Sequence, residues 1–136
     1  MRDLPGPYAG LQVKGIKVFP GDDRTAVAVI SAFTNSGAAS HNVFQTTNRG
    51  QTWTDISGNL PNLPVWTATF RGDSIKTVYV GADDGVYVTT NGGVKWSRAG
   101  SGLPHTQVFD MQFDPALGVL AVATNGCGIW EIALTQ

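Results

Sequence analysis

The stretch TTNRGQTW at residues 46–53 recurs as TTNGGVKW at residues 89–96, which is 43 positions further along the chain. The strand residues that precede the motif keep the same spacing, as VF at 43–44, VY at 86–87 and IW at 129–130. Linkers that begin with Leu-Pro also repeat, at 60–65 and 103–108, with a looser copy near the start of the chain. A period of this length indicates a repeat architecture in which each copy is one supersecondary unit.

Each unit has the pattern of short β-strands. Runs such as Val27–Ile30, Thr77–Val80 and Val119–Val122 are apolar almost throughout, which is typical of strands that are buried on both faces. Asp-Gly and Asn-Gly turn signals occur between strands, and no stretch shows the 3.6-residue period of an amphipathic helix. Four strands in a repeat of this length predict an all-β protein made of four-stranded antiparallel β-propeller blades.

The chain holds three such units, and we expect a single propeller segment over residues 1–136, or half a propeller. The blades are expected at about 11–57, 65–99 and 107–134, and the last blade stops after its third strand. Three blades form an open wedge with an apolar face at each end. Two copies could close it head to tail into a six-bladed ring, as a homodimer. Alternatively, the chain is part of a larger propeller.

The absent fourth strand of the last blade must then come from elsewhere. The segment Met1–Tyr8, of this chain or of a partner copy, could supply it. The prolines and glycines of this segment disfavour a long regular strand.

The two repeated motifs resemble the Asp-box, or bacterial neuraminidase repeat, whose pattern is Ser/Thr-x-Asp-x-Gly-x-Thr-Trp/Phe. The first copy matches it with Asn in place of Asp, at Thr46, Asn48, Gly50, Thr52 and Trp53. The second copy departs from it at Lys95, where Thr is usual. The resemblance implies a turn between the third and fourth strands of a blade, with a tryptophan that packs between blades.

The same family includes sialidases, xyloglucan-degrading glycosidases, sortilin-type receptors and photosystem assembly factors. A shared fold does not show which of these functions a chain has.

The composition argues against several kinds of partner. The formal net charge is −1 and there is no basic run, so nucleic acid is not expected as a partner. No apolar run reaches the length of a membrane helix, so no membrane partner is expected. The start of the chain lacks the apolar core of a secretory signal, so the chain as written is expected in the cytoplasm. Cys127 is the single cysteine, which excludes an intrachain disulfide and a thiolate metal cluster.

The sequence shows no catalytic group. Glycoside hydrolysis uses two carboxylates, or a Tyr/Glu pair with an arginine cluster in sialidases. The single glutamate, Glu131, is expected at a solvated strand position. The arginines that would form a cluster are scattered over turns and an outer strand, at Arg24, Arg49, Arg71 and Arg98. We therefore predict that the chain is not an enzyme and holds no metal or cofactor.

Three residues are candidate ligand contacts: Asp110, Trp66 and Phe109. Asp110 lies on the predicted innermost strand of the third blade, where it is either a channel-facing ligand group or a structural hydrogen-bond acceptor. The rings of Trp66 and Phe109, like that of Tyr8, either stack on a sugar or pack in the core. The sequence thus favours a non-catalytic module that binds a glycan or a protein. The alternative is a fragment or remnant of a secreted glycoside hydrolase.

Overall fold

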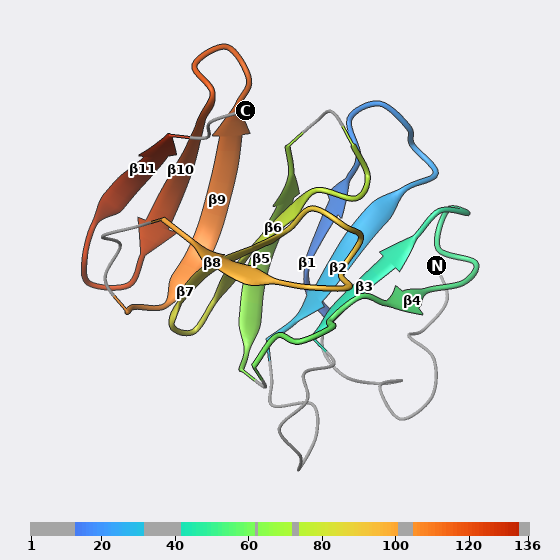
Figure 1. Cartoon of the computed structure of the whole chain (residues 1–136), viewed down its shortest axis with the longest axis horizontal. Coiled ribbons are helices and arrows are strands. Elements are labelled where there is room, and N and C mark those ends of the chain that lie inside the picture. Colours follow the sequence, from blue (N-terminus) through green and yellow to red (C-terminus); the bar gives the residue numbers. More distant parts are fainter. Residues whose placement is uncertain (1–12, 32–41, 62, 72–73, 101–104, 134–136) are drawn as a thin grey trace.

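The computed structural model of the chain describes residues 13–31, 42–61, 63–71, 74–100 and 105–133 (Figure 1). These residues form eleven strands: β1 (Val13–Val18), β2 (Ala26–Ile30), β3 (Val43–Thr46), β4 (Thr54–Asp55), β5 (Val65–Phe70), β6 (Val78–Ala82), β7 (Gly85–Thr89), β8 (Ser97–Ala99), β9 (Val108–Asp114), β10 (Val119–Thr124) and β11 (Ile129–Ala133). Tyr8 and the segment 1–8 lie outside the described residues. Within the described ranges there is no helix at all, and hence none suited to crossing a membrane.

The strands form three antiparallel sheets in chain order, which we call blades 1, 2 and 3. Blade 1 has the order β1-β2-β3-β4, blade 2 has the order β5-β6-β7-β8, and blade 3 contains β9, β10 and β11. The first strand of each blade is innermost, since β1 lies beside β5 and β5 lies beside β9 (Figure 1). The prediction of an all-β chain of antiparallel blades is confirmed, and blade 3 has three strands among the described residues.

Two apolar layers hold the blades together. The first lies between blades 1 and 2 and includes Val27, Val29, Val80 and Trp96. The second lies between blades 2 and 3 and is built around residues such as Leu120. β2 and β6 are apolar almost throughout because both of their faces are covered. β10 instead alternates between buried and half-buried residues, because one of its faces lies at the open end of the wedge.

The two repeated motifs form the same turn between the third and fourth strands of their blades. In blade 1, Thr46 Oγ1 accepts a hydrogen bond from the Gly50 N–H (2.9 Å), and Asn48 Oδ1 accepts one from the Thr52 N–H (2.9 Å). In blade 2, Thr89 Oγ1 and Asn91 Oδ1 make the corresponding bonds to Gly93 and Lys95, at 3.0 Å each. The side-chain oxygen of asparagine therefore accepts the backbone N–H bond of the turn, which is a bond that an aspartate oxygen can also accept.

The linker between blades 1 and 2 packs tightly against the turn of blade 2. The indole Nε1 of Trp96 donates to the carbonyl oxygen of Ile56 (2.9 Å), and the Trp96 backbone N–H donates to Asn59 Oδ1 (2.6 Å). Gly93 has a φ of 93°, and a Cβ there would lie 2.6 Å from the Cβ of Ile56. Glycine is therefore needed at this position both for backbone conformation and for space.

Candidate functional site

The innermost strand of every blade carries a β-bulge at the same place. β1 pairs Val13 and Gly15 with adjacent residues of β2, which leaves one extra residue between them. The same shift of register occurs near the start of β5 and of β9. The extra residues are Lys14, Trp66 and Phe109. We call them the bulge row. Because bulges redirect side chains and are common next to functional sites, three equivalent bulges on adjacent strands define a candidate site.

Trp66 is the central residue of the bulge row, and other side chains contact both the N–H edge and the face of its indole ring. Its Nε1 donates to Asp83 Oδ1 at 3.0 Å. The Lys14 Nζ lies 5.7 Å from the centroid of the Trp66 ring, within the range of a cation–π interaction. The indole is half-buried, so part of its surface remains open to solvent. These two contacts fix the orientation of the indole ring.

Phe109 is the more exposed aromatic residue of the row. Its side chain is 50% exposed, although phenylalanine is one of the residues most often buried. The exposure shows that Phe109 does not pack in the core of this chain, and stacking on a ligand stays a prediction. Trp66 is half-buried and hydrogen-bonded, and its contact with a ligand likewise stays a prediction.

Asp83 links blades 2 and 3 beside the bulge row. In addition to Trp66, its Oδ1 accepts a hydrogen bond from Gln107 Nε2 at 3.1 Å. Gln107 Oε1 in turn accepts one from Asn125 Nδ2 at 3.0 Å. Sequence reasoning treated Asp83 as a turn residue and missed this role, because its partners are 17 and 24 positions away. The repeat offers no local signal for such a contact.

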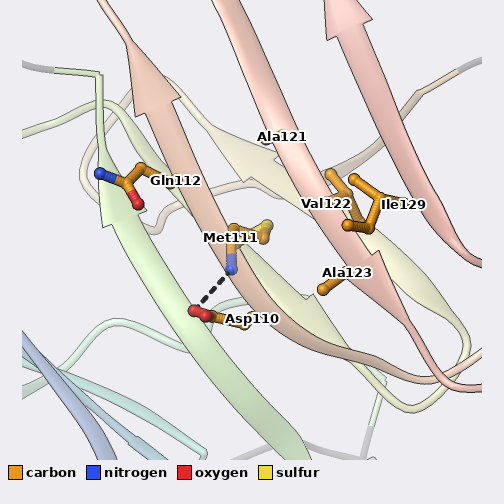
Figure 2. Close-up of a pocket in the computed structure, with 7 residues that line it drawn as sticks. All are labelled: Asp110, Met111, Gln112, Ala121, Val122, Ala123 and Ile129. Carbon is orange, nitrogen blue, oxygen red and sulfur yellow. Dashed lines mark hydrogen bonds between the residues drawn. The ribbon is translucent and has the colours of Figure 1, made fainter.

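Asp110 belongs to a separate hollow on the open face of blade 3 (Figure 2). The hollow has a volume of about 180 Å³ and is lined by Asp110, Met111, Gln112, Ala121, Val122, Ala123 and Ile129. Asp110 is on the innermost strand, as predicted, and its Oδ1 accepts a hydrogen bond from the Met111 N–H at 2.9 Å. Trp66 and Phe109 do not line this hollow. The structure thus brings two of the three candidates to equivalent positions and places the third elsewhere.

The other acidic side chains near the site are engaged in local contacts. Asp84 accepts a hydrogen bond from the Tyr87 hydroxyl (3.1 Å) and forms an ion pair with Arg98 (3.4 Å). Burial raises the pKa of the Tyr87 phenol above its ordinary value, and the adjacent Asp84 carboxylate raises it further. Glu131 is exposed on β11. Within the described ranges, no three His, Cys, Asp or Glu side chains are grouped closely enough to hold a metal ion.

The repeated sheets, with their innermost strands side by side, define the β-propeller class. The sequence matches no known family of proteins, and no curated protein matches it either. Solved structures do resemble it. An ancestral GH74 enzyme is 25% identical with a TM-score of 0.62, over 86% of this chain and 17% of that one. The GH74 xyloglucanase of Xanthomonas campestris is 16% identical (TM-score 0.65), over 96% and 23% of the two chains.

A third similar structure is YCF48 bound to D1 peptide. It is 13% identical with a TM-score of 0.65, over 94% of this chain and 38% of that one. This chain therefore covers between about a sixth and two-fifths of the length of the propeller proteins that it resembles. At these identities the comparisons show the fold.

Proposed function

We propose that this chain is a non-catalytic β-propeller module, built on Asp-box repeats, that binds its ligand on the bulge row. The observation that carries the proposal is the repeated bulge, which places Lys14, Trp66 and Phe109 at equivalent positions on three adjacent strands. A cation beside two aromatic side chains suits a ligand with ring faces and a polar or anionic group.

The local contacts of the carboxylates support binding rather than catalysis. Asp83 holds Trp66, Asp84 holds Tyr87, and Asp110 accepts a bond from its neighbour's N–H. Each is thereby occupied in positioning its neighbours, whereas hydrolysis of a glycosidic bond needs two carboxyl groups that face one substrate. The competing proposal is a remnant of a glycoside hydrolase, and the similarity to GH74 enzymes favours it.

The ligand is a glycan or a protein. Partly exposed aromatic rings suit the apolar faces of sugars, and the likeness to peptide-bound YCF48 is the reason to include proteins. The test is binding of the labelled chain to glycan and peptide arrays, compared with Phe109→Ala. We expect the variant to lose at least tenfold in affinity for the selected ligand while keeping the wild-type melting temperature, because Phe109 is exposed.

Phe113→Ala is a matched comparison, since Phe113 lies on the same strand but packs against the layer between blades 2 and 3. We expect it to lower stability. Array binding that is unchanged in Phe109→Ala would refute the site. Turnover of a xyloglucan or a sialoside by the chain would refute the non-catalytic assignment.

We further propose that the wedge closes with a second copy into a six-bladed ring. The open face of blade 1 exposes Ile16 and Val18 beside a hollow of about 170 Å³, and the open face of blade 3 exposes Ile129. Contiguous exposed apolar residues mark interaction surfaces. Light scattering on a gel-filtration peak should give twice the 14.4 kDa of one chain. A monomer at all concentrations would contradict ring closure and favour a part of a longer protein.

A further inference from the structure

One position of each innermost strand faces the preceding blade, and it is buried in blades 2 and 3 but exposed in blade 1. Counted from the bulge, this position is Ile16 on β1, Ala68 on β5 and Met111 on β9. Ala68 lies in the apolar layer between blades 1 and 2, and Met111 lies in the layer between blades 2 and 3. They are 5% and 3% exposed, whereas Ile16 is 44% exposed. Blade 1 therefore presents an open apolar residue where the other two blades pack against a neighbour.

The open face of blade 3 has room for such a residue. On β2, Val27 and Val29 belong to the layer between blades 1 and 2. Their counterparts on β10 are Ala121 and Ala123, because Ala123 is paired with the residue after the bulge of β9, as Val29 is with the residue after the bulge of β1. These two alanines line the hollow of about 180 Å³ on the open face of blade 3. Because protein interiors are closely packed, this hollow suits an aliphatic side chain from a following blade.

The third strand of blade 1 shows how a polar side chain reaches the following blade. The Nε2 of Gln45, on β3, donates to the carbonyl oxygen of Ile75 at 2.9 Å, in the loop between β5 and β6. Glu131 is the counterpart of Gln45 on β11, because each directly follows the two repeated strand residues of its blade. Glu131 is exposed and is paired with Ala121, which lines the hollow. A carboxylate only accepts hydrogen bonds, so the matching loop of a following blade must offer Glu131 a donor.

The loop between β1 and β2 places an arginine beside that contact point. The Arg49 N–H donates to the carbonyl oxygen of Arg24 (3.0 Å), and the Gly92 N–H donates to that of Lys76 (3.1 Å). Arg49 and Gly92 occupy the same position of the repeated motif, so Arg24 and Lys76 are counterparts as well. Lys76 directly follows Ile75, whose carbonyl oxygen accepts the bond from blade 1. Arg24 is therefore one residue from the point at which a preceding blade would contact blade 1.

Arg24 can bind a second carboxylate while it keeps its present one. Its Nε donates to Asp22 Oδ1 at 3.2 Å, and its side chain is 64% exposed. A guanidinium has five N–H donors and pairs well with carboxylates. The neighbouring Asp23, which would repel Glu131, is itself paired with Arg49 at 3.5 Å. The rim of blade 1 thus carries the donors that Glu131 needs.

We propose that the open face of blade 3 binds the open face of blade 1 of a second copy through two specific contacts. Ile16 of the second copy fills the hollow between Ala121 and Ala123, and Arg24 of the second copy pairs with Glu131. We call this contact the seam. The inference rests on the ring closure proposed above, and it adds the surfaces and the charge pair that select a second copy as the partner. A two-fold axis forms the same seam twice.

The seam also continues the bulge row from one copy to the next. Within the chain, Lys14 lies against Trp66 of the following blade, with its Nζ 5.7 Å from the ring centroid. Across the seam, Phe109 takes the place of Lys14, and Lys14 of the second copy takes the place of Trp66. The candidate ligand site is therefore shared between the two copies.

The test is charge reversal, with dimerisation measured by sedimentation velocity over a range of protein concentrations. We expect Glu131→Lys and Arg24→Glu each to raise the dimer dissociation constant at least about tenfold, because like charges then face each other at both seams. Mixing the two variants should restore dimerisation, because the mixed dimer has opposite charges at both seams. Lys95→Glu is the control, since it makes the same change of charge as Arg24→Glu on an exposed turn of blade 2. It should leave the dissociation constant within about twofold of the wild-type value.

The outcomes separate the seam from ring closure itself. A wild-type chain that stays monomeric at all concentrations would refute the ring and, with it, the seam. A wild-type dimer that both reversals leave intact would refute the seam alone, because the two copies would then meet through other surfaces. Two reversals that each dissociate the dimer but do not complement each other on mixing would show that Glu131 and Arg24 do not face each other, and would also overturn the proposal.

Discussion

Two adjacent glycines in the motif turn of blade 2 allow a test of how the blades stack. Gly92 and Gly93 both have positive φ, at 73° and 93°. A Cβ at Gly92 would meet only the Lys76 Cγ at 3.9 Å, whereas one at Gly93 would overlap the backbone of Ile56. Arg49 occupies the Gly92 position in the other repeat with a φ of 61°, so a side chain fits there.

The expected costs follow from these surroundings. Alanine at either position costs about 1–2 kcal/mol in backbone strain, of which roughly 0.4–1 kcal/mol is offset by lower entropy of the unfolded chain. Gly92→Ala should therefore lose about 1 kcal/mol of unfolding free energy. Gly93→Ala should lose about 1–3 kcal/mol more, because overpacking against a fixed backbone adds that amount.

The assay is urea denaturation followed by tryptophan fluorescence. Both variants are measured at one protein concentration, because association would shift their apparent stability. Equal slopes with different midpoints would show that stability alone has changed. If the two variants lose the same free energy within about 0.5 kcal/mol, Ile56 does not pack on Gly93. The stacking of the linker on the turn of blade 2 would then be wrong.

Three further predictions follow from buried contacts. Trp96→Ala should cost about 3–5 kcal/mol in chemical denaturation, and a loss below about 1 kcal/mol would mean that Trp96 is not buried between blades. Asp83→Ala should cost about 1–3 kcal/mol, because it removes the hydrogen bonds from Trp66 and Gln107, each of which contributes about 0.5–1.5 kcal/mol. Asp23→Ala, in an exposed ion pair, should cost less than about 1 kcal/mol. The pKa of Tyr87 is higher in the folded chain than in the unfolded chain, so its phenol contributes to folding stability. This contribution is fully present below about pH 10 and is lost as the pH rises through the folded-state pKa. Tyr87→Phe should flatten this fall in alkaline denaturation curves, and an unchanged curve would contradict the assignment.

Much of the fold could be predicted because the turn residues that separate the strands are part of the repeated sequence itself. The motif at 46–53 and 89–96 specifies a turn through its own side chains, so Asn48 and Asn91 make the expected bonds whatever surrounds them. The alternation of strands and turns likewise reflects local chemistry. These features depend on residues that are close in sequence.

The site could be predicted less completely because it depends on pairing between strands. The sequence indicated Trp66 and Phe109 as candidates, yet their common position follows from a one-residue shift of register that only the paired strands reveal. Lys14 was missed for the same reason, since no property of the lysine itself distinguishes it. The sequence also did not show that Asp110 lies apart from its neighbour Phe109, because the directions of their side chains depend on a bulge that only strand pairing reveals.

The most direct test of the central claim is a titration of the ¹⁵N-labelled chain with the glycan or peptide selected on the arrays. The chain has 4 tryptophans, so each indole N–H gives a separate signal. Ligand on the bulge row should shift the Trp66 indole signal and leave that of Trp96, which is buried between blades, in place. A saturating ligand that leaves Trp66 unmoved would contradict the assignment of the bulge row as the binding site.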